Sequence, residues 1–182
     1  MNKQLQRFQL NDSTELVIRP LKKSDASQAV SYLKTMYADS PYLTKYPDEW
    51  SISIEDEQKF IESTEHAKNR LMLGVFVHDN LVGLADFMSV GSGYKLEHRC
   101  QIGISVTKTY QGKGIGSLLL ETLLSSAKQA GYEQMELEVV ASNSTAIKLY
   151  ERNGFIRVGT VPHGFRYKEG YYEDLLMMVR KL

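Results

Sequence analysis

The 182-residue chain lacks the features that mark several protein classes. Cys100 is its single cysteine, so an internal disulfide or a zinc site built on cysteines is excluded. No uncharged apolar run approaches the roughly 18 residues of a membrane helix. The opening residues, MNKQLQRFQL, also lack the apolar core of a secretion signal. We therefore expect a cytoplasmic protein without a membrane partner.

The chain has no net charge either, because 22 Lys and Arg balance 22 Asp and Glu. Without an overall basic field, we expect no nucleic-acid partner. Apolar residues make up 42% and charged residues 24%, which is typical of soluble globular proteins. The length suits one domain and is short for two. We predict a single domain over residues 1–182.

Alternating or apolar runs bounded by turn residues predict about seven strands. They cover residues 15–21, 71–78, 81–90, 99–107, 135–140, 155–161 and 172–179. Apolar positions at helical spacing predict about four helices, at residues 24–39, 54–69, 115–130 and 143–152. Hairpins imply antiparallel pairing, and the β-helix-β unit over residues 99–140 allows a right-handed parallel crossover. The predicted fold class is α/β (α+β), a mixed, mostly antiparallel sheet flanked by the helices.

Local signals define several ends of these elements. Ser24-Asp25 is expected to cap the helix at 24–39. Asp79-Asn80 is a two-residue turn signal and predicts a hairpin between its two strands. Gly131 and Gly154 are expected to end the helices before them in the left-handed conformation.

Residues 111–116 read QGKGIG and lie between a strand and the strongest predicted helix. Glycines let the backbone turn sharply and approach a ligand closely. The first turn of a helix adds unpaired N–H groups and a partial positive charge, which suit a phosphate or pyrophosphate. The spacing excludes a P-loop and misses the dinucleotide fingerprint G-x-G-x-x-G by one residue. A glycine turn that only reverses the chain is the other interpretation.

A second element follows the strand at 135–140. Asn143 and Tyr150 are seven residues apart, about two helical turns, so an amide and a phenol would share one face. Both would point toward the start of the helix at 115–130. The alternative is an N-cap asparagine and a core tyrosine.

Together these segments resemble the GNAT N-acetyltransferase superfamily. The strand at 102–106 leads into QGKGIG, which matches the signature Q/R-x-x-G-x-G/A. Residues 143–155, NSTAIKLYERNGF, are similar to the family segment N-x-x-A-x-x-x-Y-x-x-x-G-F. Two matching motifs at the right separation are more specific than either one, and the predicted element order fits nearly the whole chain.

The resemblance implies acetyl-CoA as the co-substrate, a primary amine as the acceptor, direct attack of the amine on the thioester, and no metal. It implies that the backbone of residues 104–106 pairs with the pantetheine arm, that the turn holds the pyrophosphate, and that the strands around 104 and 137 part. A backbone N–H near Val106 would stabilise the developing oxyanion. The implied cofactor-binding positions are Ile104, Ser105, Val106, Gln111, Gly112, Lys113, Gly114, Ile115, Gly116, Asn143 and Tyr150.

The resemblance also implies catalytic roles. Tyr150 matches the family tyrosine that acts as general acid on the leaving thiolate. In some relatives a carboxylate lies about thirteen residues before the Q/R position, which here is His98 with Glu97 beside it. These two are candidates for the general base, and a solvated strand start is their other interpretation. Asp86 and Glu138, which interrupt apolar strands, are weaker candidates, and a relay of waters would need no dedicated base.

Family acceptor sites lie between the early helices and the C-terminal hairpin, which here means residues 37–50 and 162–172. Both segments are rich in aromatic side chains, which suit a small amine or a peptide N-terminus. Cover of the core edge, or the interface of a homodimer, is the other interpretation. The alternative function is a non-catalytic sensor that binds CoA or a nucleotide and needs no acid. A nicotinamide-dependent enzyme would require a longer parallel sheet than this chain supplies.

Overall fold

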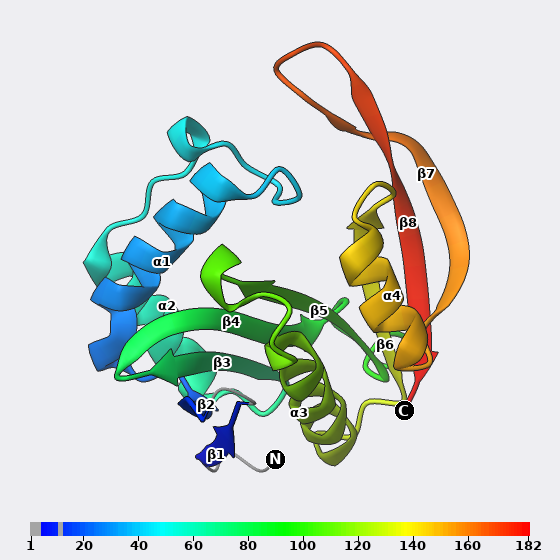
Figure 1. Ribbon diagram of the computed structural model, residues 1–182. Coiled ribbons are helices and arrows are strands. Elements are labelled where there is room, and N and C mark those ends of the chain that lie inside the picture. The colour runs from blue at the N-terminus through cyan, green and yellow to red at the C-terminus, as the bar shows by residue number, and fades with distance from the viewer. Residues whose placement is uncertain (1–4, 11–12) are drawn as a thin grey trace.

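The computed structural model describes residues 5–10 and 13–182, and its strands form one eight-stranded sheet in the order β1-β2-β3-β4-β5-β6-β8-β7 (Figure 1). The strands are β1 (Gln6–Gln9), β2 (Glu15–Pro20), β3 (Arg70–Val77), β4 (Asn80–Ser89), β5 (Arg99–Val106), β6 (Gln134–Val140), β7 (Ile156–Arg166) and β8 (Tyr172–Lys181). The helices are α1 (Ala26–Asp39), α2 (Ile54–His66), α3 (Ile115–Gln129) and α4 (Ser144–Arg152). Short 3-10 turns lie at Lys23–Asp25, Pro47–Glu49 and Lys108–Tyr110.

The predicted mixed, mostly antiparallel fold is confirmed. Every pair of neighbouring strands is antiparallel except β5 and β6. The additional strand is β1, whose sequence QRFQ has one apolar side chain and carries no strong strand signal. It pairs with β2 at the sheet edge. Outside the two undescribed segments, no helix has the length and apolar character that crossing a membrane requires.

The hairpin between β3 and β4 turns one residue earlier than predicted. Val77 pairs with Asn80, so the two loop residues are His78 and Asp79. Their φ angles are 46° and 62°, the positive values that a type I′ turn needs at both positions. The strand pairing therefore takes Asn80 into β4.

Asp25 lies at the N-cap position of α1, as the sequence predicts, but the expected side-chain cap is absent. Asp25 ends a 3-10 turn that precedes the helix, and its side chain makes no cap hydrogen bond to α1. The carboxylate instead accepts hydrogen bonds from the backbone N–H of Lys22, at 2.7 Å, and from the Arg19 guanidinium, at 2.6 and 2.9 Å. These bonds hold the pKa of Asp25 below its usual value, against the opposing effect of burial.

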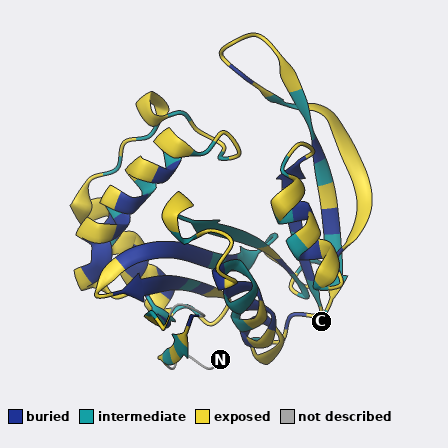
Figure 2. Cartoon of the chain, viewed as in Figure 1, coloured by how far each residue is buried: buried dark blue, intermediate teal, exposed yellow. Residues whose placement is uncertain are grey.

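Apolar side chains pack on both faces of the sheet. The residues of β3 and β4 are mostly buried (Figure 2). One cluster joins α3 and α4 to the strands and includes the fully buried Leu119 and Leu123. The other joins α1 and α2 to the opposite face and includes Ile61. A fully buried side chain of this size stabilises the fold by about 1.5–3 kcal/mol. The central strands are thus held between two helical layers.

The parallel strands β5 and β6 are paired over only three residues each. Their register joins Arg99–Gln101 to Gln134–Glu136 and then ends. Beyond that point β5 stays paired with β4, and β6 stays paired with β8. The two strands part as predicted and leave an opening at the centre of the sheet (Figure 1).

Candidate active site

The opening leaves one edge of β5 without a neighbouring strand. Ile104, Ser105 and Val106 pair with β4 on one side, and the pairing with β6 has already ended on the other. All three residues are partly exposed although they lie in a central strand. A free strand edge offers N–H and C=O groups at regular spacing, so it can pair with an extended ligand. The predicted pantetheine positions therefore have the backbone geometry that such a chain requires.

The glycine turn follows β5 directly and leads into α3. Gly112 and Gly114 have φ angles of 75° and 85°, in the left-handed region where side chains are unfavourable. Apart from the residues adjacent in the chain, no heavy atom of the described residues lies within 4 Å of the position that a β-carbon would take at either glycine. The turn is therefore a glycine-dependent backbone surface with open space beside it.

Side chains and N–H groups complete this turn. Gln111 donates a hydrogen bond from Nε2 to the Val106 carbonyl at 2.9 Å and so ties the turn to the end of β5. The Lys113 ammonium lies 5.5 Å from the ring of Tyr110. In the first turn of α3 the Ser117 N–H donates to the Gly114 carbonyl at 3.1 Å. No backbone carbonyl of the described residues accepts from the N–H groups of Ile115 and Gly116, which lie at the positive end of the helix dipole. These features fit a pyrophosphate group.

Asn143 and Tyr150 both have structural roles in α4. Asn143 caps the helix, since its Oδ1 accepts a hydrogen bond from the Ala146 N–H at 3.2 Å. Tyr150 is 8% exposed and packs against Phe155, with ring centroids 5.7 Å apart. Burial raises the pKa of the Tyr150 phenol to about 12.

Glu97 and His98 lie at the paired end of β5 and β6. The His98 carbonyl accepts from the N–H groups of Glu133 and Gln134, at 2.9 and 3.1 Å. From His98 to Val106, which precedes the glycine turn, the chain extends about 26 Å at ~3.3 Å per residue. The fold therefore does not bring Glu97 and His98 to the glycine turn.

The His98 side chain also faces this end of the sheet. It contributes to the lowered pKa of Glu136, after the larger effect of the hydrogen bond from Arg99. The Arg99 guanidinium donates to Glu136 Oε2 at 2.7 Å. This ion pair joins β5 to β6 where they are still in register, so His98 belongs to the closed part of the strand pair.

Asp86, in contrast, lies beside the opening. It pairs with Gly103 of β5, two residues beyond the last residue of β5 that pairs with β6. Burial raises the pKa of its carboxyl to about 6. Glu138 is exposed on β6, opposite Met177. The sequence signal for both is a carboxylate within an apolar strand, and only the fold distinguishes the half-buried Asp86 from the exposed Glu138.

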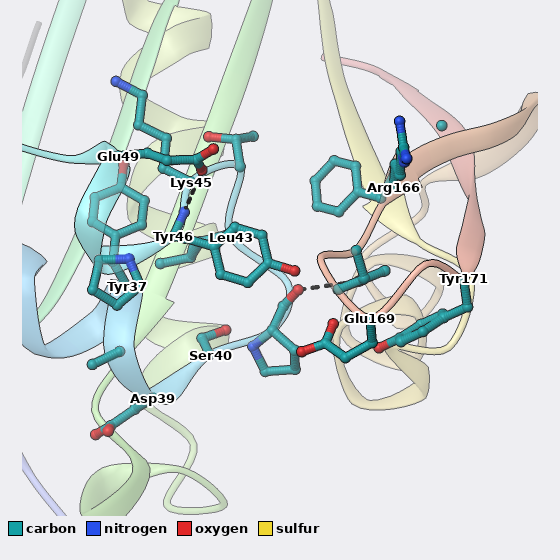
Figure 3. Close-up of a pocket in the computed structure, with 17 residues that line it drawn as sticks. Tyr37, Asp39, Ser40, Leu43, Lys45, Tyr46, Glu49, Arg166, Glu169 and Tyr171 are labelled. Carbon is teal, nitrogen blue, oxygen red and sulfur yellow. Dashed lines mark hydrogen bonds between the residues drawn. The ribbon is translucent and has the colours of Figure 1, made fainter.

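A cavity of about 560 Å³ lies where the segment after α1 meets the hairpin of β7 and β8 (Figure 3). The two segments predicted for the acceptor contribute its walls. Lining side chains are aromatic or charged at Tyr37, Asp39, Lys45, Tyr46, Glu49, Phe165, Arg166, Tyr167, Glu169 and Tyr171.

Direct hydrogen bonds tie the two walls together. The Lys168 N–H donates to the Tyr46 hydroxyl at 2.8 Å, and the Tyr167 hydroxyl donates to the Pro41 carbonyl at 3.1 Å. The rings of Tyr167 and Tyr171 stack with centroids 4.5 Å apart. Trp50 stays outside the lining and packs against Tyr37. The result is a mostly aromatic pocket with charges of both signs.

No metal is suggested by the side chains of the described ranges. Within them, no three His, Cys, Asp or Glu side chains gather in a way that could hold a metal ion. The features that do gather are a free strand edge, an anion-binding turn and an aromatic pocket. This combination is that of a protein that binds an extended, phosphate-bearing ligand.

Comparison with known proteins identifies the class. Residues 32–155, well over half of the chain, match the sequence model of the Acetyltransferase (GNAT) family. The chain therefore belongs to the GNAT acetyltransferase family. The resemblance inferred from the two motifs is confirmed.

Individual relatives support this assignment. The chain is 30% identical over 137 residues to N-alpha-acetyltransferase 60 of Xenopus tropicalis, a match that covers 70% of this chain and 53% of the relative. The chain thus spans about half of that relative's length. A GNAT acetyltransferase of Streptococcus pneumoniae has the same fold, with a TM-score of 0.88 and 24% identity over 92% of this chain and 99% of the other. The yncA structure from Salmonella typhimurium, solved with acetyl-CoA, has a TM-score of 0.81 and 20% identity over 92% of this chain and 94% of the other.

Proposed function

We propose that the protein is an acetyl-CoA-dependent N-acetyltransferase that moves an acetyl group to a primary amine by direct attack on the thioester. The observation that carries this proposal is the arrangement at the end of β5. A free strand edge runs straight into a left-handed glycine turn and the start of α3. Backbone pairing and anion binding are thus in line, as an extended arm that ends in a pyrophosphate requires.

Each part of the site has a role in this proposal. The backbone of residues 104–106 pairs with the pantetheine arm, and the N–H groups of residues 111–116 hold the pyrophosphate. Asn143, which ends the loop after β6, contacts the arm from the other side of the opening. A backbone N–H near Val106 donates to the carbonyl oxygen as negative charge develops on it.

The pKa of Tyr150 defines what its phenol contributes. At about 12, it lies above the ordinary thiol pKa of about 8.5, so the phenol stays protonated at neutral pH. Complete proton transfer from it to a thiolate would be uphill by roughly 5 kcal/mol, since a pKa difference of one unit corresponds to about 1.4 kcal/mol. The general-acid role implied by the resemblance therefore takes the form of a hydrogen bond to the leaving sulfur.

The acceptor amine enters from the aromatic pocket in this proposal. A free amine with a pKa of about 8 to 10 is mostly protonated at pH 7 and must lose a proton before it attacks. Glu97 and His98 are the bases that the family offset suggests. A peptide or protein N-terminus and a small amine are both acceptors of suitable chemistry, and the N-alpha-acetyltransferase relative adds support for the first.

Cytoplasmic location and a homodimer are further parts of this proposal. A compartment without disulfide formation is consistent with a single, buried cysteine. The homodimer rests on the family tendency alone. Light scattering behind a sizing column measures the mass directly, and a mass of 20.7 kDa, that of one chain, would contradict it.

The first experiment is a calorimetric titration of the protein with acetyl-CoA, with NAD and ATP as controls. Micromolar binding of acetyl-CoA alone is expected. Thiol release is then followed with phenethylamine, spermidine and a peptide with a free N-terminus as acceptors. No binding of acetyl-CoA refutes the proposal, and binding without turnover on any amine favours the sensor module.

A further inference from the structure

Asp86 is the one charged residue in the apolar strand β4. Residues two apart on a strand share a face, so Asp86 lies on the face of Leu84, which packs with Tyr32 of α1. On β5 the same face carries Gly103 and Ser105, which pair with Asp86 and Leu84. The carboxylate is thus on the side of the sheet that α1 and the aromatic pocket occupy.

The carboxylate extends across the backbone of β5. Its Oδ1 lies 2.9 Å from the position that a β-carbon would take on Gly103, so it fills the space left by the absent side chain. The last residue of β5 that pairs with β6 is Gln101. The carboxylate therefore lies over β5 where the opening begins.

This carboxylate has no partner. Within the described part of the chain it makes no hydrogen bond or ion pair, whereas the nearby Ser105 and Tyr32 hydroxyls bond to each other at 3.0 Å. A half-buried carboxylate without a partner is unfavourable in a fold, and groups of this kind cluster at functional sites. Asp86 thus has the surroundings of a reactive group.

Burial alone raises the pKa of Asp86 to about 6. The buried titratable groups on the helices packed against this face are the phenol of Tyr32 on α1 and the carboxyl of Glu57 on α2. Neither they nor the exposed titratable groups of these helices contribute to the raised pKa of Asp86. On the neighbouring strands the paired residues are Met72 and Gly103, which carry no charge. Asp86 is therefore ionised at neutral pH and more basic than an ordinary carboxylate.

Position relates Asp86 to both substrates. Gly103 lies three residues before Val106, about 10 Å at ~3.3 Å per residue, so an arm extended along β5 from the glycine turn leads toward it. Tyr37, which lines the aromatic pocket, follows Tyr32 by five residues, about 7.5 Å along α1. Asp86 thus lies over the part of β5 toward which such an arm leads, on the sheet face that Tyr32 of α1 covers, whereas Glu97 and His98 lie at the closed end of the strand pair.

We propose that Asp86 is the general base that accepts the proton of the acceptor ammonium group. This role rests on the function proposed above. One proton passes from the ammonium nitrogen to a carboxylate oxygen of Asp86, and the freed nitrogen lone pair forms the N–C bond to the acetyl carbonyl carbon. The C–S bond then breaks with its electron pair left on sulfur, and the nitrogen loses a second proton to water, which leaves a neutral amide. The carboxylic acid then returns its proton to water.

The test compares Asp86→Asn with Asp79→Asn, a matched control in the β3–β4 turn, where asparagine tolerates a positive φ. The rate kcat/KM is measured from pH 5 to 9 with the most active of phenethylamine, spermidine and the peptide. Asp86→Asn is expected to lower kcat about 100- to 1,000-fold, within the range for general base catalysis, with an acetyl-CoA Kd within twofold of wild type. The wild type and the control should lose activity below pH 6, and Asp86→Asn should lose that acidic limb.

Several outcomes would overturn the role. The role of Asp86 is refuted if the Asp86→Asn variant keeps the wild-type kcat and the acidic limb of its pH profile. It is also refuted if that limb is lost in Glu97→Gln or His98→Ala instead. Weakened acetyl-CoA binding that accounts for the whole loss indicates a structural role. A readout without turnover is the carboxyl resonance that titrates near pH 6 by carbon NMR and is absent from Asp86→Asn. Wild-type protein that binds acetyl-CoA but acetylates no amine refutes the proposed function itself, and the role with it.

Discussion

Replacing Asp86 with asparagine should stabilise the protein at alkaline pH while it impairs the reaction. The carboxyl has a pKa of about 6 in the folded protein and an ordinary value of 3.8. The unfolded chain therefore releases this proton more readily than the folded one does. Above pH 6 the folded state carries a buried charge that the unfolded state accommodates in water, and below pH 3.8 both states are protonated and the penalty disappears.

The magnitude follows from the difference between the two pKa values. A shift of about 2.2 units corresponds to about 3 kcal/mol at pH 8, and the same relation leaves about 1 kcal/mol at pH 4.5. The value at pH 8 is an upper limit because the side chain keeps some contact with solvent. Asparagine fills nearly the same space and cannot ionise, so it removes the penalty. For a chain of this size, each kcal/mol raises the melting temperature by roughly 2–4 °C.

Urea unfolding of wild type and Asp86→Asn at pH 4.5, 6 and 8 measures this effect. The gain in unfolding free energy should grow with pH by about 1–2 kcal/mol between the first and the last condition. Any constant difference between an amide and a protonated carboxyl cancels in that comparison. A gain that does not change with pH, or one that shrinks as pH rises, would show that the Asp86 carboxyl is not destabilised by burial.

Three further variants test other parts of the site. Gly114→Glu should abolish acetyl-CoA binding in a calorimetric titration, because it places a carboxylate at the anion site. The control is Gly131→Glu at the other end of α3, where φ is also positive and the substitution causes the same strain of about 1–2 kcal/mol. The control variant should bind acetyl-CoA normally. Tyr150→Phe keeps the packed ring but loses the hydrogen bond to the charge that develops on the leaving sulfur. The value of kcat should therefore fall roughly 10- to 150-fold while the acetyl-CoA affinity is retained. An unchanged kcat contradicts the proposed role of Tyr150. Tyr46→Phe removes the hydroxyl that accepts a hydrogen bond from the Lys168 N–H, so the KM for the acceptor amine should rise while the acetyl-CoA affinity stays constant. A change in acetyl-CoA affinity alone would argue against the acceptor pocket.

The elements of the fold could be predicted because their signals are local. The apolar stripe of α3 and the apolar runs of the central strands are properties of short segments, and all four helices lie where the periodicity indicates. The sequence predicts the hairpin turn one residue too late. Asp79-Asn80 has turn chemistry, but the register is decided by the pairing of Val77 with Asn80 across two strands. The edge strand β1 depends on β2 for its structure and has little signal of its own.

The candidate site divides in the same way. The glycine turn was predictable because its geometry belongs to the backbone of residues 111–116, and the φ angles of Gly112 and Gly114 agree with it. The environment of Asp86 was not, since its carboxylate lies over Gly103 of another strand, and the sheet face that it shares with Leu84 is covered by Tyr32 of α1. An offset of thirteen residues likewise indicates His98 without showing that it lies at the closed end of the strand pair.

Burial acts on both proposed proton-handling groups in the same direction, with opposite chemical consequences. It raises the pKa of Asp86 to about 6 and that of Tyr150 to about 12. The carboxylate becomes a stronger base, so the difference between its pKa and that of an ammonium group is smaller by about two pH units. The phenol becomes a weaker acid. In the proposed mechanism, proton removal from the amine is therefore the step that these two groups assist most. The thiolate, whose ordinary pKa of about 8.5 is lower than that of the phenol, can leave with a hydrogen bond and be protonated by water.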